Sequence, residues 1–266
     1  MNSIQQPLVP QSFIVRQECE KAASQNGFRR VLLERGGWVA FQSTTAQGTI
    51  YLAAAGSQGP WFLALEHPGV IAELDHPVAD ILGPGRVRYV FDSLNALYFV
   101  LRRVYELGVS LPDAPLLEFN TRVAGLPRTT EAERLTVQRI GQDIFRARLM
   151  DYWHGCCLLT GISDPALLRA SHIIPWSECD NDAERLNVHN GLLLSALWDA
   201  AFDRVLVTFD DKGRPEFSPN LSEQARAELR WRSSIPLTDK HRQRLARHRD
   251  RMRQATTERG LPYGDL

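Results

Sequence analysis

Four residues near the middle of the second half of the chain have types and spacing suited to metal-assisted hydrolysis. His172 ends a short apolar segment, Asn190 begins the next one, and Asp199 and Asp203 follow in a predicted helix. The two aspartates lie one turn apart, so a helix presents both carboxylates on one face. A neutral imidazole can take a proton from water, and paired carboxylates can hold a hard divalent cation. The set predicts a hydrolytic site.

The sequence strings around these residues resemble those of the HNH endonucleases, whose core is a ββα-metal finger. The matching strings are SHIIPW at 171–176, NGLLL at 190–194 and WDAAFD at 198–203. Upstream, CLLTG at 157–161 looks like that family's first strand and turn, and QRIGQDIFR at 138–146 is similar to its leading helix. The resemblance implies a nuclease fold over about residues 129–253.

The resemblance also implies a role for each matching residue. His172 takes the position of the general base, Asn190 ties down the loop that orients it, and Asp199 takes the position of the metal ligand. Asp199 stands where many members have histidine, and Ser171 stands where many place a further ligand. Because carboxylates suit Mg²⁺ better than imidazole does, we expect a water-rich Mg²⁺ site, or Mn²⁺ in its place.

Other interpretations of two of these residues stay open. Asn190 precedes Gly191, and Asn-Gly is a common turn pair. Asp203 is either a second metal ligand or a structural carboxylate that hydrogen-bonds the backbone or pairs with Arg204 or Arg169.

The four cysteines do not predict a zinc site or a disulfide framework. Cys156 and Cys157 are adjacent, whereas Cys19 and Cys179 stand alone, so no C-x-x-C pair exists. Structural zinc is therefore not expected. Few cysteines and the lack of a secretory signal at the N-terminus favour a cytoplasmic protein, and no apolar run reaches the length that a membrane helix needs.

Charge is balanced over the whole chain but not along it. The sequence contains 31 basic and 31 acidic residues. Basic residues gather near the C-terminus, where residues 238–253 predict a helix with two rows of arginine. These rows are Arg242, Arg249 and Arg253, and Arg244, Arg247 and Arg251. Such rows either contact DNA phosphates or form a solvated helix face.

The order of predicted elements indicates an α+β protein with two domains. A helix at 12–26, four short strands at 31–33, 38–43, 49–54 and 61–65, and a helix from Leu94 that stops at Gly108 predict a mixed N-terminal domain with a small antiparallel sheet. Residues 112–128 contain three prolines and predict a linker. We place the domains at 1–125 and 126–266, the second being the ββα nuclease domain with flanking helices and a basic C-terminal helix.

The N-terminal domain resembles no family, and its role is either target selection or dimerisation. Its aromatic residues more often belong to a core, but in an exposed cleft they could stack on a flipped or modified base. They are Trp38, Phe41, Tyr51, Trp61 and Phe62.

Taken together, these features predict a metal-dependent endonuclease that cleaves double-stranded DNA as a restriction or defence enzyme. A cut through both strands needs two active sites, so we expect a homodimer. The alternatives are a non-catalytic DNA-binding protein on a degenerate HNH scaffold, and a nonspecific nuclease or RNase.

Overall fold

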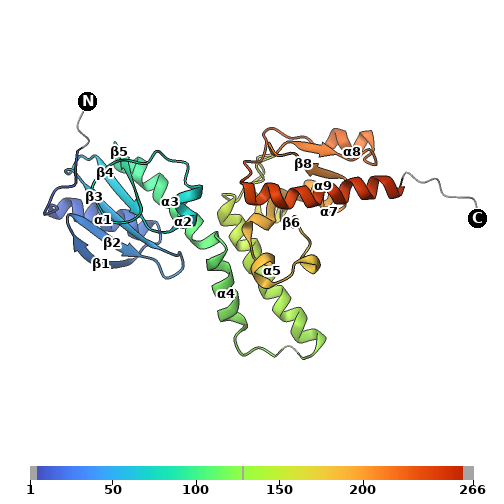
Figure 1. Cartoon of the computed structure of the whole chain (residues 1–266), viewed down its shortest axis with the longest axis horizontal. Coiled ribbons are helices and arrows are strands. Elements are labelled where there is room, and N and C mark those ends of the chain that lie inside the picture. Colours follow the sequence, from blue (N-terminus) through green and yellow to red (C-terminus); the bar gives the residue numbers. More distant parts are fainter. Residues whose placement is uncertain (1–4, 128, 260–266) are drawn as a thin grey trace, which may run out of the picture. The chain divides into compact units, whose positions relative to one another are not determined.

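The computed structural model describes residues 5–127 and 129–259, which divide into two compact units. The first unit is Met1–Ala114 and the second is Pro115–Leu266. The fold is mixed α+β, as the sequence predicts (Figure 1). In the described residues, no helix is both long and apolar enough to cross a membrane.

The first unit is an antiparallel sheet with helices at both ends of its sequence. Its strands lie in chain order, β1-β2-β3-β4-β5, so each connection joins neighbouring strands. Its elements are α1 (Phe13–Gln25), β1 (Arg30–Arg35), β2 (Trp38–Gln42), β3 (Thr49–Ala54), β4 (Trp61–Leu65), α2 (Pro68–Glu73), β5 (Val87–Phe91) and α3 (Leu94–Ser110). The predicted four-strand meander is confirmed, and β5 extends it by one strand that the sequence analysis missed.

Local signals in the sequence explain where the helices of this unit begin. Ser12 and Ser93 have extended backbones, and their hydroxyls accept the backbone N–H groups of Val15 and Ala96 at the starts of α1 and α3. The prediction that α3 stops at Gly108 is wrong. The helix passes Gly108 with its backbone close to the β2–β3 loop, where Gln47 donates its N–H to the Gly108 carbonyl.

The predicted linker at 112–128 is also wrong over most of its length, because it contains helix α4 (Asp113–Val123). Pro112 precedes the helix and Pro115 lies in its first turn, where the missing N–H group breaks no helical hydrogen bond. Phe119 and Val123 are buried. The prolines therefore mark the start of a helix rather than an irregular connection.

The second unit contains two small antiparallel sheets, one of β6 and β7 and one of β8 and β9. Its elements are α5 (Glu131–Tyr152), η1 (Pro165–Leu167), β6 (Leu168–His172), η2 (Trp176–Glu178), α6 (Asp182–Arg185), η3 (Val188–Asn190), β7 (Gly191–Ser195), α7 (Ala196–Asp203), β8 (Val207–Phe209), β9 (Pro215–Phe217), α8 (Glu223–Glu228) and α9 (Asp239–Arg259). The predicted hairpin and the predicted terminal helix are both present.

The strands β6 and β7 and the helix α7 form the ββα unit that the resemblance implies. His172 pairs with Gly191 at one end of the β6–β7 ladder, and Leu168 pairs with Ser195 at the other. The segment 157–161, expected to begin with a strand, is instead a turn, closed by the hydrogen bond from the Gly161 N–H to the Cys157 carbonyl.

Helices α5 and α9 frame this ββα unit. Thr130 caps α5 in a reciprocal box with Glu133. Arg146 of α5 donates to the carbonyls of Leu168 and Pro165 at the start of β6. Helix α9, drawn in red in Figure 1, contacts β8 and η3. The strand that carries His172 is thus held from outside the ββα unit as well as within it.

Candidate active site

His172 lies at the end of β6 with its ring held on three sides. The ring stacks on Phe145 of α5, with 3.8 Å between ring centroids, and its edge meets the Trp176 ring at 88°. Nε2 lies 2.9 Å from the Arg185 carbonyl. Because a carbonyl only accepts hydrogen bonds, Nε2 carries the proton, and in the neutral ring Nδ1 is left as the proton acceptor.

The electrostatic surroundings keep this imidazole neutral. Burial lowers the pKa of His172 below its ordinary value, and the Arg185 carbonyl and the Glu184 charge oppose this only in part. A histidine with a lowered pKa is unprotonated at neutral pH. It can therefore accept a proton from water, as a general base must.

Asn190 is fully buried and clamps the loop that follows His172. Its Oδ1 accepts the Ile174 N–H at 2.8 Å, and its Nδ2 donates to the Ile174 carbonyl at 3.1 Å. Its own carbonyl accepts the Ile173 N–H. Asn190 thus fixes the two residues directly after His172, and it ends the short helix η3 rather than forming a simple Asn-Gly turn.

Gly191 is needed for close packing and not for a turn. Its backbone is extended, and a Cβ at this position would lie 2.5 Å from Cζ of Phe145. Phe145 is the ring on which His172 stacks. The Asn190-Gly191 pair therefore combines a loop clamp with the space that the stacking ring occupies.

The two aspartates of α7 occupy different surroundings. Asp199 accepts a 2.6 Å hydrogen bond from the Ser171 hydroxyl, so the serine next to His172 anchors a carboxylate. Asp203 is exposed and forms no ion pair with Arg204 or Arg169 in the described part of the chain. Partial burial raises the pKa of Asp203, and the Asp199 charge adds to the shift.

A cavity of about 320 Å³ brings His172 and Asp203 together. Its wall also includes Trp176 and, from α9, His248 and Arg251. Asp199 is not in this wall, although its carboxylate is close enough to act electrostatically on Asp203. The sequence analysis named His172, Asp203 and Arg251 separately, and the structure gathers them around one space.

His248 is a part of this cavity that the sequence analysis missed. Its Nε2–H donates to the Phe202 carbonyl at 3.1 Å, and its Nδ1 accepts from the Thr208 hydroxyl at 2.9 Å. Its ring stacks on Phe202, and burial lowers its pKa to about 4. His248 therefore joins α9 to the end of α7 beside Asp203. In the sequence, the feature that could have pointed to His248 is its position one helical turn before Arg251.

Most of the arginines on α9 are bound within the protein. Arg242, Arg244, Arg249 and Arg253 form ion pairs with Asp239, Glu184, Asp211 and Asp250, respectively. Arg251 lies 3.9 Å from Glu178, at the limit of an ion pair. Arg247 is exposed and has no ion pair among the residues that the structure describes. Of the six, Arg247 and Arg251 are the most available to a polyanion.

The donor set suits a hard cation better than zinc. Within 5–127 and 129–259, no cluster of three or more His, Cys, Asp or Glu side chains is placed to hold a metal ion. Two carboxylates supplemented by water form a ligand set that Mg²⁺ accepts, whereas structural zinc takes four protein ligands, mostly sulfur and nitrogen. Asp199 and Asp203 thus fit a loosely held divalent ion.

A histidine at the end of one strand, an antiparallel partner strand and a following helix with two carboxylates define a ββα hydrolase site. Residues 157–210 match the family model described as HNH endonuclease, so this part of the chain is an HNH endonuclease domain. Such a domain implies a phosphodiester hydrolase with a nucleic acid substrate, and HNH nucleases generally use a divalent metal. The chain matches no curated protein sequence significantly.

Proposed function

We propose that the protein is a metal-dependent endonuclease that hydrolyses phosphodiester bonds in double-stranded DNA. The observation that carries this proposal is the cavity in which His172, Asp203 and Arg251 meet, built partly from the HNH domain. It combines a proton acceptor, an acidic group and a cation in one space. These are the groups that phosphodiester hydrolysis needs.

In this mechanism His172 acts as the general base. The Arg185 carbonyl holds Nε2–H, and Phe145 and Trp176 hold the plane of the ring, so Nδ1 takes the proton of the attacking water. Asn190 keeps the following loop in place. Arg251 binds non-bridging phosphate oxygens, which its planar guanidinium matches.

Asp203 and Asp199 are the residues that would hold the divalent cation, and Ser171 orients the second of them. When bound, Mg²⁺ or Mn²⁺ supplies charge stabilisation for the pentavalent phosphorus and the leaving 3′ oxygen. We expect products with 3′-hydroxyl and 5′-phosphate ends.

The N-terminal unit makes a restriction or defence role the best interpretation of the whole chain. Residues 1–156 lie outside the family match, and the first unit is a separate compact body with its own sheet. We assign target selection to this unit and cleavage to the second, with the cleaving form a homodimer. Dimerisation is the competing role for the first unit.

One observation favours a second candidate, a DNA-binding protein that does not cleave. The described residues bring together no three-ligand metal cluster, and Ser171 stands where many HNH members place a ligand. A degenerate scaffold would share both features. The two candidates differ in their response to metal, because the scaffold binds DNA equally with or without it.

A plasmid-nicking assay with His172→Ala tests the proposal. The wild-type protein should nick supercoiled plasmid in Mg²⁺ or Mn²⁺ and stop in EDTA. His172→Ala should lose at least about 100-fold in rate, the usual contribution of a general base, and still bind DNA. His154→Asn is the matched control, because His154 has a φ of 56°, which asparagine tolerates, and lies outside the cavity.

The pH profile adds a second readout for His172. The base must be neutral, and burial places its pKa below the ordinary 6.5. The wild-type rate should therefore hold as the pH falls through 6.5 and decline only below it. Unchanged nicking by His172→Ala would contradict the assignment, and equal DNA binding with no nicking under any metal would favour the non-catalytic scaffold.

A further inference from the structure

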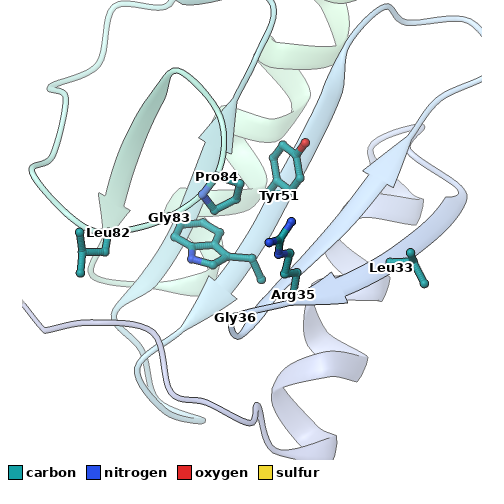
Figure 2. Close-up of a pocket in the computed structure, with 8 residues that line it drawn as sticks. Leu33, Arg35, Gly36, Tyr51, Leu82, Gly83 and Pro84 are labelled. Carbon is teal, nitrogen blue, oxygen red and sulfur yellow. The ribbon is translucent and has the colours of Figure 1, made fainter.

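The first unit contains a cavity of about 480 Å³ on one face of its sheet. Its wall comes from the β1–β2 hairpin, from β3 and from the segment before β5. Figure 2 shows Leu82, Gly83 and Pro84 on one side of this space and Leu33 and Arg35 on the other. Ligand pockets of roughly 300–1,000 Å³ are typical for small molecules, so a single aromatic ring system fits.

Two of the eight residues that line this cavity are aromatic. Trp38 is only 3% exposed and packs against Phe62 and Ile81 in a buried cluster, which makes it a rigid part of the wall. Tyr51 is partly exposed, and its hydroxyl donates to Glu66, which fixes its ring. Two aromatic side chains are thus held in place around an open space.

Gly83 packs directly against the buried Trp38 ring, and both residues line the cavity. A Cβ at Gly83 would lie 2.6 Å from Cζ2 of Trp38, so any side chain there would displace the indole ring. The rim is apolar, because Leu33 and Leu82 are 86% and 80% exposed. Exposed leucines at the mouth of an aromatic cavity suit a partner that also carries flat apolar surface.

Arg35 adds a positive charge to the wall. It pairs with Trp38 across the hairpin, so both side chains lie on the same face of the sheet. Among the described residues Arg35 forms no ion pair, whereas the neighbouring Glu34 pairs with Arg16 at 3.4 Å. The guanidinium is therefore free to bind an anionic group beside the cavity.

We propose that this cavity binds a nucleobase extruded from double-stranded DNA, with the base against the partly exposed Tyr51, the buried Trp38 supporting the wall, and an adjacent phosphate on Arg35. The proposal rests on the proposed function, because the HNH domain makes nucleic acid the substrate. Enzymes that inspect single bases commonly stack them between aromatic or apolar side chains. Residues 1–125 hold ten basic and eleven acidic residues, so a local pocket explains DNA contact better than bulk charge does.

Binding of the full-length protein to labelled duplexes in EDTA tests this proposal without cleavage. One duplex carries a single unpaired thymine, which leaves the stack easily, and the other is fully paired. The wild type should prefer the first by about tenfold. Tyr51→Leu should reduce that preference by about fivefold or more, the usual effect of losing one base–aromatic stack. Trp38→Leu should also reduce it, because the wall of the cavity loses its support.

Arg35→Ala and its matched control, Arg30→Ala, separate the pocket from general charge. Both residues are exposed arginines of β1, but only Arg35 lines the cavity. Arg35→Ala should weaken binding to the unpaired-base duplex more than Arg30→Ala does. If melting curves show that Trp38→Leu is unfolded, the comparison of Arg35→Ala with Arg30→Ala still tests the proposal, because the Arg30 and Arg35 side chains lie outside the core.

The outcomes distinguish this proposal from the nuclease proposal. Metal-dependent nicking without any preference for the unpaired base, or binding of the unpaired-base duplex that Arg35→Ala weakens no more than Arg30→Ala does, would overturn the pocket and leave the nuclease proposal intact. A preference for the unpaired base that depends on the pocket residues, without any nicking, would overturn the nuclease proposal and support the pocket. A second copy of the chain could occupy the cavity instead of a base. Light scattering would then show a dimer that Leu82→Ala converts to monomer, and this result would also overturn the base-binding proposal.

Discussion

Two cavities, one at His172 in the second unit and one at Trp38 in the first, are lined by different kinds of side chain. The cavity of the second unit contains His172, Asp203, His248 and Arg251, all of which can carry charge. That of the first unit contains Trp38, Tyr51, two leucines and a proline, with Arg35 as its one charged group. Proton transfer and charge stabilisation need titratable groups, whereas discrimination between flat ligands needs surfaces of fixed shape.

A buried amide side chain supports each cavity, and the two amides differ in how fully they are hydrogen-bonded. Both ends of Asn190 are bonded to the Ile174 backbone. Gln11 donates through Nε2 to the carbonyls of Gly37 and Ala54, while its buried Oε1 has no partner within the described residues. The loop beside His172 is therefore held more tightly than the hairpin beside Arg35.

The largest expected effect comes from removing the charge of Asp203. Asp203→Asn should reduce cleavage by about 100-fold or more, since a divalent ion contributes several kcal/mol to the transition state. The same variant should keep the wild-type preference for a duplex with an unpaired base. Nicking rates and binding in EDTA measure the two properties separately.

Asp250→Asn is the control for Asp203→Asn, because Asp250 is exposed on α9 outside the cavity. If Asp203→Asn changed base preference and left cleavage unaffected, the division of labour between the cavities would be wrong.

The amide pair gives a comparison of stability. Asn190→Ala leaves the Ile174 N–H without its partner and the Ile174 carbonyl with only the weak thiol donor of Cys179, and should lower the free energy of unfolding by about 2–4 kcal/mol. Gln11→Ala also removes an unsatisfied oxygen, so its effect should be smaller, at about 1 kcal/mol. Urea titrations followed by circular dichroism measure both. Equal losses would show that the two loops are held alike.

Much of the fold was predictable because its signals are local. The strands of the meander are short apolar runs between glycines, and Thr130 with Glu133 marks the start of α5 within four residues. Helix α4 was not predictable from proline content alone, because Pro112 precedes the helix and Pro115 lies in its first turn, where proline is compatible with a helix. Arg86 directly precedes β5 and Arg88 lies between Val87 and Tyr89 within it, so a partly buried strand is hidden in a polar composition.

The candidate site was predictable only in part, for a different reason. His172, Asn190 and Asp199 stand in recognisable strings, but nothing local to Arg251 or His248 indicates that α9 lies against α7. That contact depends on the stacking of His248 on Phe202 and on its bond to the Phe202 carbonyl. Likewise, the hydrogen bond of Ser171 to Asp199 joins positions that are distant in the sequence. Tertiary packing decides such pairs.

The smallest expected effect distinguishes the arginines of α9 from one another. Arg251 lines the cavity, whereas Arg253 is exposed and paired with Asp250. Arg251→Ala should weaken duplex binding about tenfold and reduce the slope of log K against log salt by about 1, as the loss of one phosphate contact does. Arg253→Ala should change affinity by less than about twofold, since surface pairs contribute little. Anisotropy titrations at several salt concentrations measure the affinity and the salt slope of each variant. Equal slopes for Arg251→Ala and Arg253→Ala would mean that α9 acts as a diffuse charged surface and that Arg251 makes no specific contact in the cavity.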